Sequence, residues 1–234
     1  MSKLKLICST ALFAACLSSG FAPAYAQTRV ALELVLAVDA SSSVDAQEYR
    51  LQVDGYVRAF RDPDVIAAIQ TLGSRGIAVT YVEWSSRFRQ VQSVGWTHMH
   101  DAQGSHAFAR AIAENANQLQ ASGTALGEAV IYSVDLFDGN GFAGDRRTID
   151  VSADDRYNAG SSPTYARTVA EARQITVNGL AIDETGELTA YFADNVITGP
   201  DAFVITARSY DDFATALKHK LLRELGEPKL ARAE

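Results

Sequence analysis

The stretch "VALELVLAVDASSSVDAQEYR", residues 30–50, sets the expected fold class. Its first nine residues form an aliphatic run that only Glu33 interrupts. A run this short is typical of a strand covered on both faces, as in a parallel sheet. The run ends at Asp39, three serines follow, and from Asp45 to Phe60 apolar side chains recur at helical spacing. We therefore expect a buried strand, a polar loop and a helix in succession.

The same alternation continues along the chain. Further strands are predicted at 76–85, 88–96, 147–153, 175–182 and 202–207. Further helices are predicted at 63–72, 101–119, 124–137, 163–174 and 210–225. The 88–96 segment alternates apolar and polar residues, which places it nearer an edge of the sheet. The pattern predicts an α/β fold that is doubly wound, with a mostly parallel central sheet and helices on both faces (Rossmann-like).

The first 26 residues have the pattern of a secretory signal peptide. Lys3 and Lys5 precede an apolar stretch from Leu6 to Leu17, and Ala24-Tyr25-Ala26 provides a small-x-small cleavage site. A looser alternative is a lipoprotein box with lipidation at Cys16. We expect a signal peptide at 1–26, one domain at 27–226 and a flexible tail at 227–234. Export to the periplasm or secretion follows from that reading.

Charge narrows the classes of partner. The leader contains two of the 21 Lys and Arg residues and none of the 28 acidic residues, so its removal changes the formal net charge from −7 to −9 (19 − 28). An acidic domain repels phosphate backbones and anionic lipid head groups. Nucleic acid is therefore not an expected partner, and no segment is apolar enough to predict a membrane span. Divalent cations and proteins fit the charge better.

The polar loop after the first strand suggests a cation site. Sites in open parallel sheets form at the carboxyl ends of strands. Asp39, Ser41 and Ser43 alternate, so they point the same way if the loop is extended. Oxygen ligands of this kind suit Mg²⁺, Mn²⁺ or Ca²⁺. An alternative is a helix cap, because Asp45 follows Ser42 by three residues as in a variant capping box.

Two later stretches strengthen the cation hypothesis. "SGTALGEAV", residues 122–130, places Thr124 between two glycines at the start of a predicted helix. "IDVSADD", residues 149–155, ends a predicted strand at Asp154. In order along the chain, the set resembles the metal-ion-dependent adhesion site (MIDAS) of von Willebrand factor type A domains. More narrowly, "LVLAVDASSSVD", "GTALGEAV" and "RRTIDVSADD" resemble a bacterial secreted family of uncharacterised function (DUF1194-like).

The resemblance implies a specific set of ligands. Ser41 and Ser43 would bind the cation directly, Thr124 directly or through water, and Asp39 and Asp154 mostly through water. One coordination position would stay open for a Glu or Asp of a protein partner, and Mg²⁺ is the first choice of cation. This sequence has Asp155 where the family pattern often has Gly, which leaves Asp155 as an alternative to Asp154.

Three functions remain open from the sequence. The first is an exported, non-enzymatic module that binds a protein partner through the cation. The second is a metal-assisted hydrolase that uses the same site, although a Mg²⁺ phosphoesterase usually has a denser cluster of acids. The third is a metal-free α/β interaction domain. Two weaker motifs are set aside: "GNGFAG" at 139–144 is predicted as a flexible loop, and His98 and His100 are predicted as part of a surface turn.

Overall fold

The computed structural model describes residues 27–119 and 122–226. The predicted leader with Cys8 and Cys16, and the predicted tail, lie outside the described residues. Within the described part, six strands form one sheet in the order β3-β2-β1-β4-β5-β6. The strands are β1 (Thr28–Asp39), β2 (Ile77–Trp84), β3 (Gln90–Met99), β4 (Phe142–Ala153), β5 (Thr176–Ile182) and β6 (Val204–Ala207). Only the β2–β3 pair is antiparallel, which confirms the expected mostly parallel sheet with an edge strand at β3.

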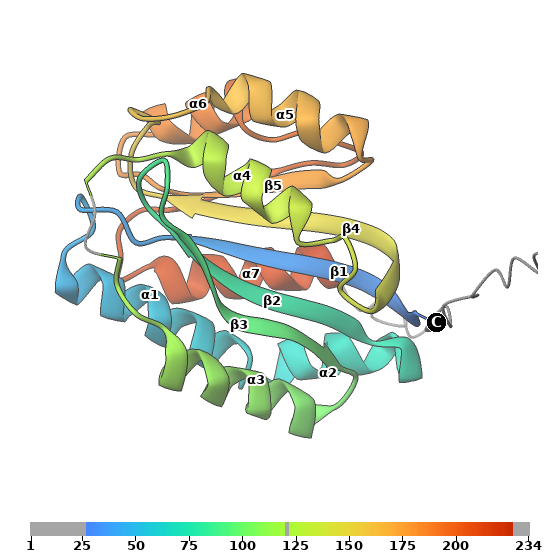
Figure 1. Ribbon diagram of the computed structural model, residues 1–234. Helices are drawn as coiled ribbons and strands as arrows, with labels where there is room; N and C mark the ends of the chain where they lie inside the picture. The colour runs from blue at the N-terminus through green and yellow to red at the C-terminus, as the bar shows by residue number, and fades with distance from the viewer. Residues whose placement is uncertain (1–26, 120–121, 227–234) are drawn as a thin grey trace, which may run out of the picture.

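Helices cover both faces of the sheet (Figure 1). One face carries α1 (Ala46–Ala59), α2 (Pro63–Thr71), α3 (Ala102–Asn115) and α7 (Phe213–Leu225). The other face carries α4 (Leu126–Asp135), α5 (Pro163–Ala172) and α6 (Glu187–Asn195). A short 3₁₀ helix, η1 (Gly73–Arg75), precedes β2. None of the described helices is long and apolar enough to cross a membrane.

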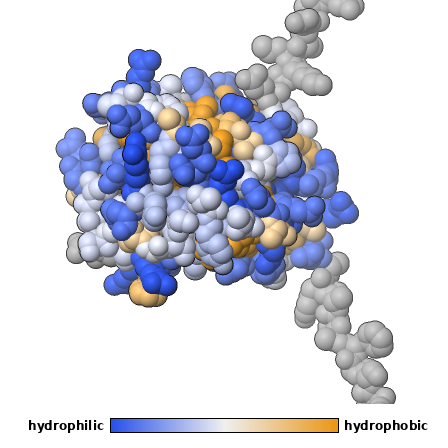
Figure 2. Space-filling view, turned by 90° about the horizontal axis from the view of Figure 1, so that it is seen from above, coloured by the Kyte–Doolittle hydropathy of each residue, from blue (hydrophilic) through white to orange (hydrophobic). Residues whose placement is uncertain are grey.

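The core explains why the first strand reads as a continuous aliphatic run. On β1, Leu34 and Leu36 pack with α1 and α7, while Val35 and Ala37 pack under α4 and α5, and all four are fully buried. Because successive strand residues point to opposite faces, a strand buried on both faces needs apolar residues at nearly every position. Seen from above in Figure 2, the outer surface is mostly hydrophilic, with apolar patches among the polar side chains.

The topology positions the predicted site. Strand β1 pairs with β2 on one side and with β4 on the other, so the chain reverses its direction of winding at β1. In open α/β sheets, ligands bind at the carboxyl ends of strands beside such a switch point. Asp39 is the last residue of β1 and lies opposite Trp84, the last residue of β2. The loop with the three serines therefore begins at the switch point.

Three local predictions were wrong. The predicted helix 101–119 ends at Asn115, because the backbone N–H of Asn117 turns to donate to the buried Glu83 carboxylate. The loop predicted at 139–144 ends inside β4, where Gly144 N–H donates to Glu33 at 2.6 Å. His98 belongs to β3 rather than to a turn. Helix α6 was not predicted, and only two of its side chains are buried.

Candidate metal site

Hydrogen bonds hold the start of the loop that follows β1. Ala40 N–H donates to Trp84 O at 2.8 Å, and Ser41 N–H donates to Asp39 Oδ1 at 2.8 Å. The side-chain Nε2 of Gln52, in α1, donates to the backbone oxygen of Asp39 at 3.1 Å. Asp39 and Ser41 are buried, whereas Ser43 is exposed. These contacts fix the start of the loop, so the side chain of Asp39 has a defined direction.

The serines do not cap the following helix. Helix α1 is capped by Asp45, which accepts hydrogen bonds from the N–H groups of Gln47 and Glu48, while Glu48 accepts from Asp45 N–H. This is a complete capping box, and each such cap contributes about 1 kcal/mol. The alternative in which Ser42 opens a capping box with Asp45 is therefore wrong. The hydroxyls of Ser41 and Ser43 are free for another role.

Two of the three predicted segments meet through a chain of hydrogen bonds. Ser41 Oγ lies 3.0 Å from Ser43 Oγ, and Ser43 Oγ donates to Asp154 Oδ1 at 3.0 Å. Asp154 follows β4 directly and lies 111 positions along the chain from Ser43. The other oxygen of Asp154 accepts a hydrogen bond from Tyr210 Oη at 2.9 Å. The exposed Asp155, the alternative ligand, instead accepts from the N–H of Arg156.

Thr124 lies at the same edge of the sheet, but other residues hold it in place. Its N–H donates to Asn158 Oδ1 at 2.8 Å, and Asn158 Nδ2 donates to its hydroxyl at 3.4 Å. The next residue, Ala125, donates to Ser85 O at 2.8 Å, directly beyond the end of β2. Gly123 has φ +104°, a conformation that favours glycine, and so turns the chain into α4. No hydrogen bond in the described part joins Thr124 to the serine loop.

The electrostatics single out Asp39. Burial and, to a smaller extent, the nearby negative charge of Asp154 together raise the pKa of the Asp39 carboxyl from 3.8 to about 8. Asp39 Oδ2 has no hydrogen-bond partner although it is fully buried. Among residues 27–119 and 122–226, no Lys, Arg or His forms an ion pair with Asp39 or Asp154. A buried oxygen without a partner is costly unless something outside the chain satisfies it.

The donor set fits a hard divalent cation. The side chains gathered at this edge provide two carboxylates and three hydroxyls, and oxygen donors of this kind are the ligands of Mg²⁺, Mn²⁺ and Ca²⁺. Within the described ranges, no group of three or more His, Cys, Asp or Glu is placed to hold a metal ion. The set is thus poor in charge, which distinguishes it from a site built from many acids.

Sequence reasoning missed three residues that support this set. Tyr210 and Asn158 hold Asp154 and Thr124 from loops, and Gln52 holds the backbone of Asp39 from α1. Each is an ordinary polar residue in a segment without a motif. Of the three, only Gln52 had a signal in the sequence. Its spacing from Tyr49 and Tyr56 puts it on the buried face of α1.

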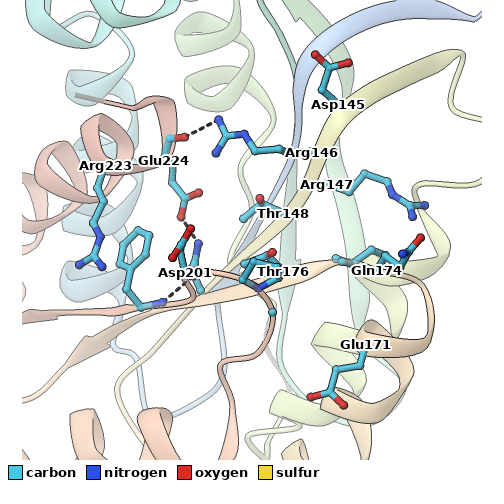
Figure 3. A pocket seen from close by; sticks show the side chains of 15 residues that line it. Asp145, Arg146, Arg147, Thr148, Glu171, Gln174, Thr176, Asp201, Arg223 and Glu224 are labelled. Carbon is cyan, nitrogen blue, oxygen red and sulfur yellow. Dashed lines mark hydrogen bonds between the residues drawn. The ribbon is translucent and has the colours of Figure 1, made fainter. Parts of the chain in front are cut away.

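Two hollows flank the sheet ends. A groove of about 440 Å³ runs beside the candidate site, and Asp154 and Tyr210 lie on its wall. A larger cavity of about 660 Å³ lies at the opposite edge (Figure 3). It is lined there by Arg146 and Thr148 of β4 and by Arg223 and Glu224 of α7, and by none of the predicted site residues. The groove, rather than the larger cavity, therefore borders the candidate site, through Asp154.

Comparison with known proteins places the chain in a family. A model for a family of proteins of unknown function, DUF1194, matches residues 29–229. The chain belongs to this family. No curated protein is similar enough to the sequence of this DUF1194 protein to count as a match.

Solved structures identify the fold as that of a von Willebrand factor type A domain. Proximal thread matrix protein 1 from the mussel byssus, with a zinc occupied MIDAS motif, matches with a TM-score of 0.62 and 15% identity over 86% of this chain and 47% of that chain. A von Willebrand factor type A protein from Catenulispora acidiphila matches with a TM-score of 0.60 and 15% identity over 84% and 43%. The Mfa5 pilus tip domain from Porphyromonas gingivalis matches with a TM-score of 0.57 and 9% identity over 86% and 98%. The DUF1194 chain spans about half the length of the byssus chains it matches.

Proposed function

We propose that this DUF1194 protein is an exported, non-enzymatic module that binds a protein partner through a divalent cation. The cation, Mg²⁺ in the first place, would be held by the side chains at the carboxyl edge, namely Asp39, Ser41, Ser43, Thr124 and Asp154. When bound, the cation supplies a positive centre that attracts a carboxylate of the partner. The observation that carries the proposal is the fully buried Asp39 Oδ2, which has no hydrogen-bond partner among the described residues.

The chain's own groups would do three things. The Ser41–Ser43–Asp154 chain of hydrogen bonds holds three oxygen donors together before any cation arrives. Tyr210 orients the Asp154 carboxylate, and Asn158 orients the Thr124 hydroxyl. Because only two carboxylates contribute charge, a bound divalent cation stays electrophilic toward a further carboxylate. Export and a protein partner with a free Glu or Asp belong to the same proposal, supported by the leader pattern and by the net charge of −7.

Neither alternative has an observation of equal weight. A metal-assisted hydrolase normally needs several acids around its cations, and the described site contains two. The metal-free domain drew its support from the serines as a helix cap, but Asp45 caps α1 instead.

Metal-dependent unfolding tests the cation step. At a Mg²⁺ concentration of about 100 times the Kd, binding to the native state adds about 2.7 kcal/mol, or a rise of about 5–10 °C in Tm for a chain of this size. We expect this rise over EDTA in the native protein and its loss in a Ser41→Ala/Ser43→Ala variant. Ser42→Ala is the matched control, because Ser42 is exposed and lies between the two proposed ligands. Equal Tm values in Mg²⁺, Mn²⁺ and EDTA would refute the cation site.

Partner capture tests the binding step. The immobilised protein should retain a partner from a periplasmic extract in Mg²⁺ and release it in EDTA, and the double-alanine variant should retain none. Once the partner is identified, replacing its contacting Glu or Asp by the amide should abolish binding. Turnover of phosphoester or peptide substrates by the Mg²⁺-loaded protein would instead support the hydrolase.

A further inference from the structure

Large apolar side chains that face solvent are concentrated in two neighbouring segments. Among the described residues, those with the greatest exposure are Phe88 (85% exposed), Tyr165 (58%), Val91 (40%) and Tyr157 (40%). Phe88 and Val91 lie in or next to the β2–β3 turn, and Tyr157 and Tyr165 lie in the loop after β4 and at the start of α5. Both segments lie at the carboxyl edge of the sheet, which also carries the candidate metal site. A cluster of exposed apolar side chains marks an interaction surface more often than chance.

The turn that carries Phe88 is held rigidly. Ser85 N–H donates to Arg89 O at 3.0 Å, and Arg89 N–H donates to Ser86 O at 3.1 Å. Gln90 Nε2 closes the turn by donating to Ser86 O at 2.8 Å. A phenyl ring presented on such a turn loses little conformational entropy when a partner covers it, which favours binding.

One carboxylate joins the two exposed segments. Glu128, on the first turn of α4, lies 3.8 Å from Arg87 and accepts hydrogen bonds from Ser161 N–H and Ser161 Oγ. Gly127 allows this close approach, because a Cβ there would lie 2.2 Å from Ser161 O. The hydrogen bond from Ala125 to Ser85 places the turn beside Thr124. The two segments that carry the exposed aromatic side chains are thus held next to each other, and the β2–β3 turn lies beside Thr124.

The charge of the turn is opposite to that of the molecule. Arg87 and Arg89 flank Phe88 and are exposed, and the Arg87 guanidinium lies 5.4 Å from the centre of the Phe88 ring. The chain as a whole has a formal net charge of −7. Aromatic residues and arginine together are the composition enriched at the centres of protein interfaces. A partner segment that is acidic and carries an apolar side chain matches both features.

We propose that Phe88, Arg87 and Arg89, together with Tyr157 and Tyr165, form a docking surface for an acidic protein segment. One carboxylate of that segment would reach the cation, an apolar side chain a few residues away would cover Phe88, and further acidic side chains would lie against the two arginines. This inference rests on the proposed function and adds to it the chemistry of the partner.

Selection from a random peptide library tests both levels separately. Phage-displayed random peptides are bound to the immobilised protein in Mg²⁺ and eluted with EDTA. We expect the enriched peptides to share an Asp or Glu with a Leu, Ile, Phe or Tyr within a few residues. A selection that enriches no acidic peptide in a Mg²⁺-dependent manner overturns the proposed function, and the docking surface with it. Acidic peptides with no apolar preference overturn the docking surface alone.

Point variants then locate the contact. For a synthetic peptide from the selection, Phe88→Ser should weaken binding at least tenfold while the Mg²⁺-dependent rise in Tm stays unchanged. Arg89→Gln should weaken binding most at low salt, and Arg110→Gln, an exposed arginine of α3, is the matched control and should have no effect. Unchanged peptide binding by Phe88→Ser overturns the inference. A second result would also overturn the inference: the selection fails, and the protein forms a dimer that Phe88→Ser dissociates. In that case the surface would serve self-association.

Discussion

Two buried aspartates on neighbouring strands differ in whether the described chain places a cation beside them. Asp150, in the middle of β4, forms an ion pair with Lys220 of α7, although neither of its oxygens has a hydrogen-bond partner. Lys220 Nζ also lies 3.3 Å from Glu224 Oε1. Asp39, at the end of β1, has one hydrogen bond from Ser41 N–H and no cation from the described part of the chain. Asp150 is 3% exposed and Asp39 is 0% exposed, so burial alone does not separate them.

We expect this difference to separate a carboxyl group that serves the fold from one that serves the proposed metal site. A buried carboxylate needs a cation or several hydrogen bonds. The α7 side provides both for Glu224, since Asn178 also donates to it, and Arg146 donates to the backbone of the same residue (Figure 3). At the carboxyl edge, no described residue provides a cation for Asp39, and the proposed function assigns that role to a bound metal ion. Four experiments test this contrast.

The largest effect is expected from Lys220→Met. The change leaves Asp150 and Glu224 buried without their cation, and removal of one partner from a buried pair costs about 3–5 kcal/mol. The loss should be the same in Mg²⁺ and in EDTA, as measured by urea unfolding. Lys218→Met is the matched control on the same helix. Lys218 is 30% exposed and pairs with Asp62 and Asp64, so its loss should cost at most about 1 kcal/mol. Rescue of Lys220→Met by Mg²⁺ would contradict the contrast.

A third buried carboxylate, Glu83 of β2, is satisfied by hydrogen bonds alone. It accepts from Asn117 N–H at 2.9 Å and 3.1 Å, and the hydroxyls of Tyr49 and Ser93 also donate to it. Burial nevertheless raises its pKa from 4.5 to about 7. The native state then binds this proton more tightly than the unfolded state, so the stabilisation is complete below pH 4.5 and is lost as the pH rises through 7.

Glu83→Gln should therefore flatten the pH profile of stability. The pKa change corresponds to at most about 3 kcal/mol between pH 5 and pH 8. We expect the free energy of unfolding of the native protein in EDTA to fall over this range, and that of the variant to fall less by about this amount. Parallel profiles for the two proteins would show that Glu83 stays ionised in the fold, and that hydrogen bonds alone suffice to hold a buried carboxylate charged.

The sequence was sufficient to predict the sheet and the loop that carry the candidate site. It was insufficient to predict the residues that hold the proposed ligands in place. The aliphatic run of β1 and the alternation of elements depend on local periodicity, so they predicted the sheet and the position of Asp39. The capping residue was ambiguous, because Ser42 with Asp45 and Asp45 with Glu48 both have the required spacing. Glu is preferred at position N3 of a capping box, and the structure has the pair Asp45 and Glu48.

The supports were not predictable because they depend on contacts between distant segments. Tyr210 lies 56 positions from Asp154, and Asn158 lies 34 positions from Thr124. No periodic pattern or motif connects residues in such loops. The early end of α3 has the same origin, since a single buried carboxylate on β2 diverts a chain that otherwise has helical spacing.

Asp39→Asn tests the functional side of the contrast directly. The amide oxygen can still accept from Ser41 N–H, and the amide is a neutral group of the same shape as the carboxyl, so the protein in EDTA should lose no stability. The Mg²⁺-dependent gain, about 2.7 kcal/mol at 100 times the Kd, should disappear. Asp155→Asn is the matched control, because Asp155 is exposed and adjacent to the proposed ligand Asp154. A variant that keeps the full Mg²⁺ effect would remove Asp39 from the site.

The smallest effect is expected from Tyr210→Phe, which removes one hydroxyl and leaves the ring in place. Asp154 Oδ2 loses a hydrogen bond of 2.9 Å, which should cost about 0.5–1.5 kcal/mol of stability in EDTA. A carboxylate that is less well oriented should also bind the cation about tenfold more weakly, as is usual when a residue that supports a metal ligand is lost. Titration calorimetry with Mg²⁺ measures this affinity, and Tyr165→Phe, with an exposed ring, provides the baseline. If Tyr210→Phe lowers stability without changing the Mg²⁺ affinity, Asp154 is held for the fold, as Asp150 is, and only Asp39 among the acids of this edge depends on an external cation.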